Sequence, residues 1–428
     1  MRLNKLVHFI KNDDGYIVIN PLIGEIDVID SELYNMLISA NFNLIPQKIF
    51  EMLKDKLIIV QDNYNEFYAY ENLLKKLKFD VSFQTFTILV TRSCNFECVY
   101  CYEHTNQILL QERHMNRRIA DEVIEFINRM SYNSKKIKVI FYGGEPLLNI
   151  NVLTYLMDEL ESHQGQKITF ELITNGYLVK DLWEKYKKYF KKFKQIQITL
   201  DGPPEIHNKL RPLRGGLPTF ETIITGIKLL TDNGVHVALR SNLYLKYIKE
   251  YPKLLDELDR YGINKKYLHI GIGFVHPDEI KNYPLISKKF LNLYLQIKRR
   301  GFSITLPFYV QRIPCGAITN NSFVIDYNGD IYKCWALVGL KQFKVGTVQK
   351  GISEKTHRKF LSLNPLNNLK CRDCPMLMFC GGGCIYNNYL HSGKLDLGFC
   401  PFQKYSFREY LQLFIKELGD KYASRKQI

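Results

Sequence analysis

The chain has 428 residues, 46% of them apolar, and carries 59 basic against 43 acidic side chains, a net charge of +16. This length allows two or three domains with a sizeable core. No stretch reaches the ~18 apolar residues of a membrane span, and charges interrupt the apolar N-terminal stretch by residue 11. The sequence therefore predicts a cytoplasmic protein with no membrane association. The basic side chains are scattered through helical stretches such as 184–194, so nucleic-acid binding is not expected.

Residues 1–80 are predicted to form a small unit of their own. The sequence NDDG separates two apolar stretches, as is typical of a β-hairpin. One helix is expected to begin with Ser31 as its N-cap, and two more are expected at 46–56 and 66–78. A small sheet with three helices resembles a winged helix-turn-helix domain. A structural cap without a binding role is the alternative.

From residue 83 to residue 301 the sequence alternates between strand and helix patterns. Strands are predicted at 84–91, 136–142, 167–174, 194–200, 235–243 and 267–275. Helices are predicted at 116–130, 150–162, 180–191, 219–233, 247–261 and 286–300. This alternation predicts an α/β fold with a parallel sheet. Six units are too few for a closed eight-fold barrel, so we expect a partial (β/α)6 TIM barrel with its site at the C-terminal ends of the strands.

Three of the ten cysteines, Cys94, Cys98 and Cys101, lie in one loop after the first strand of this region. In a reducing compartment such a group indicates a metal site rather than disulfides. Structural zinc normally takes four ligands from two segments. A [4Fe–4S] cluster held by three thiolates leaves one iron open to a small ligand. The spacing C-x3-C-x2-C, with Tyr100 before the last cysteine, resembles the signature of the radical S-adenosylmethionine (SAM) superfamily, in which SAM binds the open iron.

Segments at the ends of the following strands resemble the same superfamily. YGGEP follows the second strand, and the resemblance implies that its glutamate holds the SAM amino group. TNG and TLDG end the third and fourth strands and would face the ribose, and the stretch HNKLR would supply an arginine for the SAM carboxylate. The resemblance implies that SAM contacts Tyr100, Tyr142, Gly143, Gly144, Glu145, Pro146, Asn175, Thr199, Asp201, Arg211 and Asn242. A loop salt bridge between Asp201 and Arg211, and plain packing of Asn242, are the alternatives.

The other seven cysteines lie between residues 302 and 428 and resemble those of a SPASM domain, a module with two auxiliary iron–sulfur clusters. By order, the first auxiliary cluster would take Cys315, Cys334 and Cys384, and the second would take Cys371, Cys374, Cys380 and Cys400. The resemblance thus implies three [4Fe–4S] clusters. Seven thiols are one fewer than two closed clusters need, so the first should keep an open iron. A zinc ribbon made of Cys371, Cys374, Cys380 and Cys384 is the alternative.

These features together resemble peptide-modifying (RiPP) maturases of the sactipeptide and ranthipeptide type. The resemblance implies a thioether bond from a cysteine sulfur to a carbon in a ribosomally synthesised precursor peptide. Residues 1–80 would then bind the leader of this Cys-containing peptide, and a ferredoxin or flavodoxin would supply electrons at low potential. Carbon–carbon cross-linking is a variant. Sulfatase-maturing (formylglycine-generating) enzymes are another alternative, but they carry Asp where this chain has Trp335. A non-enzymatic electron-transfer or zinc-binding scaffold would explain the cysteines but not YGGEP and TLDG.

Overall fold

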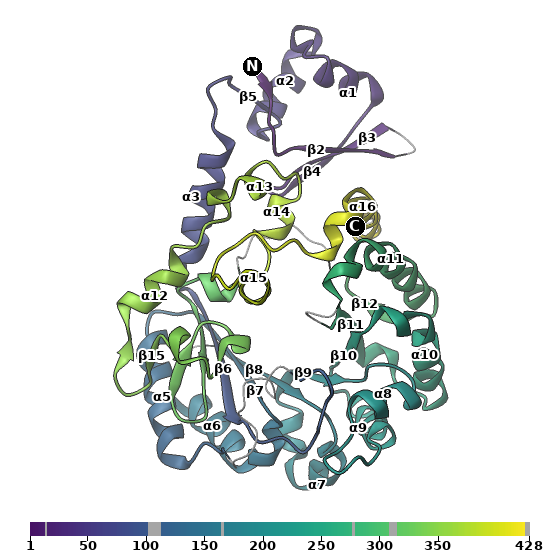
Figure 1. Ribbon diagram of the computed structural model, residues 1–428. Helices are drawn as coiled ribbons and strands as arrows, with labels where there is room; N and C mark the ends of the chain where they lie inside the picture. Colours follow the sequence, from purple (N-terminus) through teal and green to yellow (C-terminus); the bar gives the residue numbers. More distant parts are fainter. Residues whose placement is uncertain (13–14, 102–112, 164–166, 276–278, 308–314, 424–428) are drawn as a thin grey trace.

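The computed structural model describes residues 1–12, 15–101, 113–163, 167–275, 279–307 and 315–423 (Figure 1). Three regions follow one another along the chain. The N-terminal unit stands at the top of the view, the large sheet and its helices form the lower body, and the C-terminal region lies between the two. The helix α3 (Glu66–Lys78) connects the N-terminal unit to the large sheet. The C-terminal region therefore contacts both of the regions that precede it.

The large sheet has the parallel topology that the alternating pattern predicts. Its strands lie side by side in chain order: β6 (Phe83–Thr91), β7 (Lys136–Gly143), β8 (Lys167–Thr174), β9 (Phe193–Thr199), β10 (Val237–Leu243) and β11 (Leu268–Phe274). The predicted helices are α5 (Arg117–Ser131), α6 (Ile150–His163), α7 (Val179–Phe190), α9 (Phe220–Asp232), α10 (Tyr251–Arg260) and α11 (Tyr283–Arg299). The sheet ends in β12 (Ser303–Ile304) on one side and β16 (Gly351–Ile352) on the other, so it forms an open barrel.

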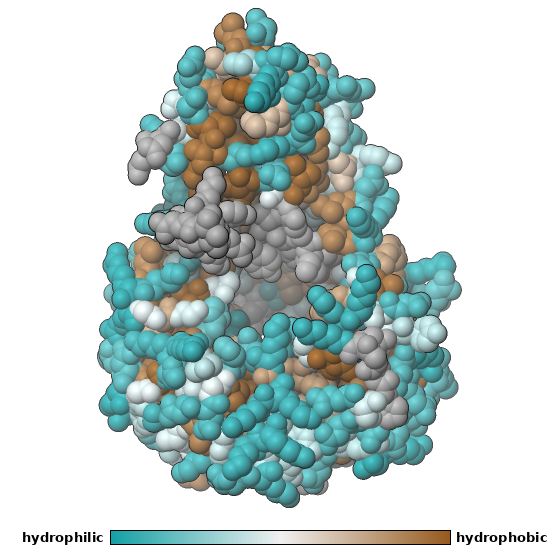
Figure 2. All heavy atoms as spheres, turned by 180° about the vertical axis from the view of Figure 1, so that it is seen from behind, coloured by the Kyte–Doolittle hydropathy of each residue, from teal (hydrophilic) through white to brown (hydrophobic). Residues whose placement is uncertain are grey.

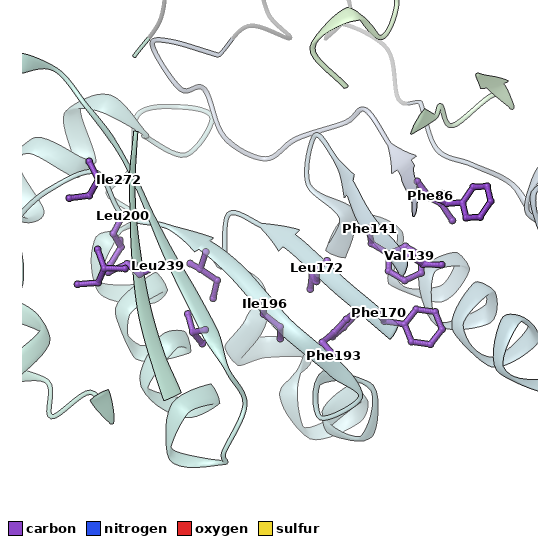
Figure 3. Packing of buried hydrophobic residues seen from close by; sticks show 14 of the residues in the cluster. Phe86, Val139, Phe141, Phe170, Leu172, Phe193, Ile196, Leu200, Leu239 and Ile272 are labelled. Atoms are coloured by element: carbon purple, nitrogen blue, oxygen red, sulfur yellow. The ribbon is translucent and has the colours of Figure 1, made fainter. Parts of the chain in front are cut away.

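The alternation of side chains along the strands separates the core from the barrel interior. Ile196 and Leu239 are fully buried in the apolar core of the body, where Figure 3 shows them among aromatic and aliphatic neighbours. The next residue on each of these strands, Gln197 and Arg240, lines a cavity inside the barrel instead. Because successive side chains of a strand point to opposite faces, a buried apolar face leaves the other face free for polar groups.

The N-terminal unit contains a three-stranded antiparallel sheet. β2 (His8–Asn12) and β3 (Gly15–Asn20) form the predicted hairpin, and β4 (Glu25–Ile29) pairs with the other side of β3. The remaining elements are β1 (Arg2–Leu3), β5 (Ile59–Val60), α1 (Ser31–Ile38), α2 (Gln47–Asp55) and α3. The predicted N-cap of α1 is wrong by one residue. Asp30 is the cap, because its carboxylate accepts a hydrogen bond from the Leu33 N–H at 2.7 Å. The winged-helix assignment stays a prediction.

The C-terminal region continues the large sheet. β13 (Ser322–Ile325) pairs in parallel with β6, and β14 (Asp330–Tyr332), β15 (Gly346–Thr347) and β16 follow in antiparallel order. Arg92, at the end of β6, forms a buried ion pair with Asp326 in the turn between β13 and β14. The cysteine-bearing loops of this region are therefore fixed directly to the strand that precedes the Cys94 loop.

Short helices carry or flank the C-terminal cysteines: α12 (Glu354–Leu361), α13 (Leu369–Arg372), α14 (Leu377–Cys380) and α15 (Ile385–Ser392). The final helix, predicted at 406–418, is α16 (Phe407–Ala423). It packs on α11, where the Tyr410 hydroxyl donates to the Ser287 carbonyl at 3.2 Å. Across the described ranges, no helix has the length and apolar character needed to cross a membrane.

Candidate active site

A cavity of about 430 Å³ lies inside the barrel at the C-terminal ends of its strands. The three cysteines of the loop after β6, Cys94, Cys98 and Cys101, line it. Other predicted site residues on its wall are Tyr100, Tyr142, Gly143, Gly144, Asn175, Thr199, Arg211 and Asn242. Residues that were not predicted as site residues complete the wall, namely Ile173, Thr174, Gln197, Arg240 and Trp335. Groups from widely separated parts of the chain therefore share one cavity.

The glycine pair Gly143–Gly144 fits closely against the cysteine loop. A Cβ on Gly144 would lie 2.3 Å from the Ser93 carbonyl oxygen, and a Cβ on Gly143 would lie 2.1 Å from that of Thr91. Gly143 also has a φ of 127°, which disfavours any side chain there. The Gly144 N–H donates to the Thr91 carbonyl at 3.1 Å. Glycine is required at both positions because the backbone after β7 touches the backbone that leads into Cys94.

Glu145 is fully buried and joins the ends of two strands. Its carboxylate accepts hydrogen bonds from the Leu147 N–H at 3.0 Å, the Thr174 hydroxyl at 2.6 Å and the Asn175 N–H at 2.7 Å. Burial raises its pKa. Glu145 and Pro146 do not line the cavity. In the structure Glu145 orients the cavity-lining residues Thr174 and Asn175, and the Asn175 side-chain amide in turn donates to the Asn95 side-chain carbonyl in the cysteine loop at 2.7 Å.

Tyr100 connects the cysteine loop to the far side of the barrel. Its hydroxyl donates to the Asp201 carboxylate and accepts from Arg211 Nη1 at 2.9 Å. Asp201 also accepts from the Asn242 N–H at 2.7 Å and lies behind the cavity wall, 1% exposed. Burial opposes the charge of Arg211, but Tyr100, Cys98 and Asp201 hold its pKa well above the ordinary value. The predicted Asp201 and Arg211 are thus joined through a tyrosine, and Arg211 remains a fixed cation near Cys98.

His207 belongs to the same network, although no sequence pattern marks it as a site residue. It lies on α8 (Pro204–Leu210), and its Nδ1 accepts from the Asp201 N–H at 3.2 Å. Its Nε2 is therefore the protonated nitrogen and donates to the Thr219 hydroxyl oxygen at 3.1 Å. The Thr219 hydroxyl donates to the Arg211 carbonyl at 2.8 Å. Burial lowers the pKa of His207 well below the ordinary value, so the ring is neutral. His207, in the HNKLR stretch, thus helps to fix the backbone of Arg211 through the Thr219 hydroxyl.

The seven C-terminal cysteines gather in the two groups that the resemblance implies. Burial raises the pKa of Cys315 and of Cys334; the nearby Cys384 raises both further, and Cys315 also raises that of Cys334. Cys371, Cys374, Cys380 and Cys400 line a second small cavity, of about 20 Å³. We call Cys315, Cys334 and Cys384 the open group, and the other four the closed group. Cys384 belongs with Cys315 and Cys334, not with Cys371 and Cys374, which argues against the zinc ribbon.

The donor sets fit iron–sulfur clusters. Burial raises the pKa of Cys94, Cys98 and Cys334, so thiolates at these positions need a bound cation. Within the described ranges, no three His, Cys, Asp or Glu side chains converge closely enough to bind a single metal ion. A cluster does not require such convergence, because each thiolate binds a different iron. The cavity contains three thiols, and three glycines, Gly381, Gly382 and Gly383, directly follow Cys380 of the closed group. Both features match this chemistry.

Comparisons with known proteins agree with this site. The model of the radical SAM superfamily matches residues 88–258. The chain is 23% identical to the radical SAM cyclopropyl synthase TigE of Paramaledivibacter caminithermalis, over 96% of this chain and 95% of the relative. It is 24% identical to the serine-type anaerobic sulfatase-maturating enzyme of Bacteroides thetaiotaomicron, over 75% and 86%.

Two solved structures share the fold. Native anSMEcpe with bound AdoMet and Cp18Cys peptide has a TM-score of 0.63 at 20% identity, covering 79% of this chain and 98% of that one. SuiB of Streptococcus suis bound to the precursor peptide SuiA has a TM-score of 0.54 at 18% identity, covering 91% of this chain and 97% of that one. The likeness to SuiB therefore extends over most of the chain.

Proposed function

We propose that this chain, which belongs to the radical SAM superfamily and is related to its peptide- and protein-maturing enzymes, modifies a ribosomally made precursor peptide. One observation carries the proposal. The cavity places the Cys94, Cys98 and Cys101 thiols on the same wall as Arg211 and the polar strand ends. A scaffold that only binds metal or transfers electrons would not need a cavity lined by such groups.

The residues of the cavity have distinct roles in this proposal. When bound, the cluster and SAM supply the power to remove a hydrogen atom from an unactivated carbon. Arg211, held charged by Tyr100, binds the SAM carboxylate at the cysteine end. Thr199 and Asn242 offer hydrogen bonds to the nucleoside end. Trp335, whose ring lies 5.6 Å from that of Tyr142, covers the cavity on the side of the C-terminal region and helps to exclude water.

The central test is replacement of all three loop cysteines by Ala. Anaerobically reconstituted wild-type protein should hold about twelve irons from three clusters, and the variant about eight. The variant should form no 5′-deoxyadenosine from SAM and reductant. Iron analysis and chromatography of the nucleoside products measure both effects. A triple variant that still cleaves SAM would show that the cluster assignment is wrong.

The N-terminal unit is proposed to bind the leader of the precursor peptide. β4 is an edge strand of its sheet, and Val28 on β4 is 66% exposed. Figure 2 shows apolar side chains gathered on the rear face of this unit. An extended leader could add a strand to such an edge. Hydrogen exchange should show β4 amides becoming protected when a precursor peptide is added, and no change in β4 exchange would contradict this role.

The bond that the enzyme forms is proposed to be a thioether. The open group has three thiols for a four-iron cluster, which leaves one iron for the cysteine thiolate of the substrate. A thiolate held there would be deprotonated and fixed beside the carbon from which the hydrogen atom is removed, and the auxiliary cluster would accept the one electron released when the carbon–sulfur bond forms. A Cys-containing peptide should change the spectrum of this cluster, whereas its Cys→Ser form should not. The product should be about two mass units lighter and resist thiol alkylation. An external low-potential donor, a ferredoxin or flavodoxin, is proposed to supply the electrons.

Carbon–carbon bond formation is the second candidate, because a relative named cyclopropyl synthase matches nearly the whole chain. That product would also lose about two mass units, but its cysteines would still react with iodoacetamide. Sulfatase-type maturation is less favoured, since Trp335 occupies the position after Cys334 where sulfatase-maturing enzymes carry an aspartate. Formation of an aldehyde, detected with a hydrazide reagent, would favour it.

A further inference from the structure

Arg240 projects into the cavity without a partner that neutralises it. It lies on β10, and its Nε donates to the Asn242 side-chain carbonyl at 3.0 Å. Among the described residues, no carboxylate forms an ion pair with it, and its two Nη nitrogens have no acceptor. Its guanidinium lies over Gly273 of β11: a Cβ on Gly273 would be only 1.8 Å from Arg240 Nη2. The glycine therefore provides the space that the guanidinium occupies.

The described carboxylates behind the cavity wall form their hydrogen bonds with groups other than Arg240. The described wall of the cavity contains Arg211 and Arg240 but no Asp or Glu. Asp201 and Glu145 lie behind the wall, where Asp201 is bound by the Tyr100 hydroxyl and the Asn242 N–H, and Glu145 by Leu147, Thr174 and Asn175. The hydrogen bond that Arg240 forms in the described part of the chain goes to the neutral side chain of Asn242. Burial lowers the pKa of Arg240. A charge that is costly to bury without a partner indicates a site for an anionic ligand.

The two arginines serve different parts of the cavity. Arg211 donates to the hydroxyl of Tyr100 in the cysteine loop, so it lies at the cluster end. Arg240 pairs with Thr199 of β9 and Gly271 of β11, and its side chain is bound to Asn242 of its own strand. Its strand, β10, is separated from β6 by β7, β8 and β9. A cosubstrate whose amino-acid end binds the open iron cannot place the same carboxylate beside Arg240 as well.

We propose that Arg240 binds a carboxylate of the peptide substrate, either an acidic side chain next to the modified residue or the C-terminal carboxylate. This inference rests on the proposed function and adds to it a preference for an anionic residue. Asn242 fixes the guanidinium through Nε, which leaves the two Nη groups to form paired hydrogen bonds with a planar carboxylate. Gly273 is a positioning residue, because a side chain there would displace the Arg240 guanidinium from this position.

The experiment compares three variants of the reconstituted protein: Arg240→Gln, Gly273→Ala and Gly271→Ala. Gly271 is the matched control, since a Cβ there would meet no atom closer than the Leu239 carbonyl oxygen at 4.0 Å. The added methyl of Gly273→Ala displaces the far end of a flexible side chain, so the barrel should still fold. Anaerobic calorimetry with SAM present would use three blocked pentapeptides: Ac-AAEAA-NH2, Ac-AAQAA-NH2 and Ac-AAQAA with a free C-terminal carboxylate. SAM binding and SAM cleavage would be measured in parallel.

Wild-type protein and Gly271→Ala should bind one carboxylate peptide about tenfold more tightly than the neutral peptide. Arg240→Gln and Gly273→Ala should abolish this preference. Which of the two charged peptides is preferred identifies the side chain or the C-terminus as the source. Three results would overturn the proposal: a preference that survives in Arg240→Gln, an equal loss in Gly271→Ala, or a tenfold loss of SAM affinity without a loss of peptide preference. Wild-type protein that never cleaves SAM would instead overturn the proposed function.

Discussion

The open and closed cysteine groups lie in one region but differ in their surroundings. Cys315 and Cys384 of the open group are exposed, and Cys334 is followed by the cavity residue Trp335. The closed group surrounds a space of about 20 Å³ that is lined by residues between 370 and 404. Tyr70 of α3 is buried close to Cys371 and Cys380. Two of the three thiols of the open group are thus exposed, whereas all four thiols of the closed group are half-buried.

This difference implies that the two groups have separate tasks. The closed group has the four thiols that one cluster requires, and it ties α13, α14 and the Cys400 loop together where the N-terminal unit docks. Further contacts fix that interface. The Lys78 ammonium donates to the Leu361 and Leu363 carbonyls, and the Arg372 guanidinium lies 5.0 Å from the Phe67 ring centroid. The N-terminal unit thus packs against the segments that carry and flank the closed group, and removing it would expose that side of them.

The largest expected effect separates the groups by function. Cys384→Ala should reduce peptide modification by about 1000-fold or more, because the cluster that holds the substrate thiolate is lost. The variant should remain folded and still produce 5′-deoxyadenosine. Cys380→Ala, in the closed group, should instead lower the unfolding temperature and the yield of folded protein. Product mass spectrometry and thermal unfolding, run on both variants, make the comparison. Equal losses of stability in the two variants would show that the groups do not differ.

A smaller effect is expected from replacing Tyr70, which is buried close to two cysteines of the closed group. Tyr70→Ala removes a side chain that is 4% exposed, and should lower the free energy of unfolding by about 3 kcal/mol. Tyr68→Ala is the matched control on the same helix, because Tyr68 is 62% exposed and its loss should cost no more than about 0.5 kcal/mol. Denaturant titration measures both. Tyr70→Ala should also release iron from the closed group more readily to a chelator, whereas Tyr68→Ala should not.

The sequence predicts best what depends on local pattern. Strand and helix positions in the barrel follow from periodicity, whereas the division of the C-terminal cysteines into two groups comes from the family resemblance and not from their spacing alone. Residues whose role depends on register between strands are not predictable in this way. Arg240 matters because β11 places Gly273 beside Asn242, a pairing that no linear pattern reveals. Glu145 shows the same limit, since its three hydrogen bonds come from the turn after β7 and the end of β8.

The smallest expected effect is a pH dependence at the interface between the N-terminal unit and the segments around the closed group. His8 of β2 packs with its ring 5.5 Å from those of Phe379 and Phe407, and it donates a hydrogen bond to the Pro375 carbonyl. Burial lowers its pKa from 6.5 to about 4. The unfolded chain therefore binds a proton between these values while the folded protein does not, so stability is full above pH 6.5 and falls as the pH is lowered toward 4.

At pH 5.5 this linkage should cost about 1.4 kcal/mol relative to neutral pH. His8→Gln, which cannot titrate, should lose that part of the pH dependence even if its stability is lower at every pH. The measurement is the unfolding free energy of both proteins from pH 5.5 to 7.5, within the range where the clusters survive. Parallel pH profiles for the two proteins would show that His8 is not held neutral at this interface, and that the interface is looser than its contacts indicate.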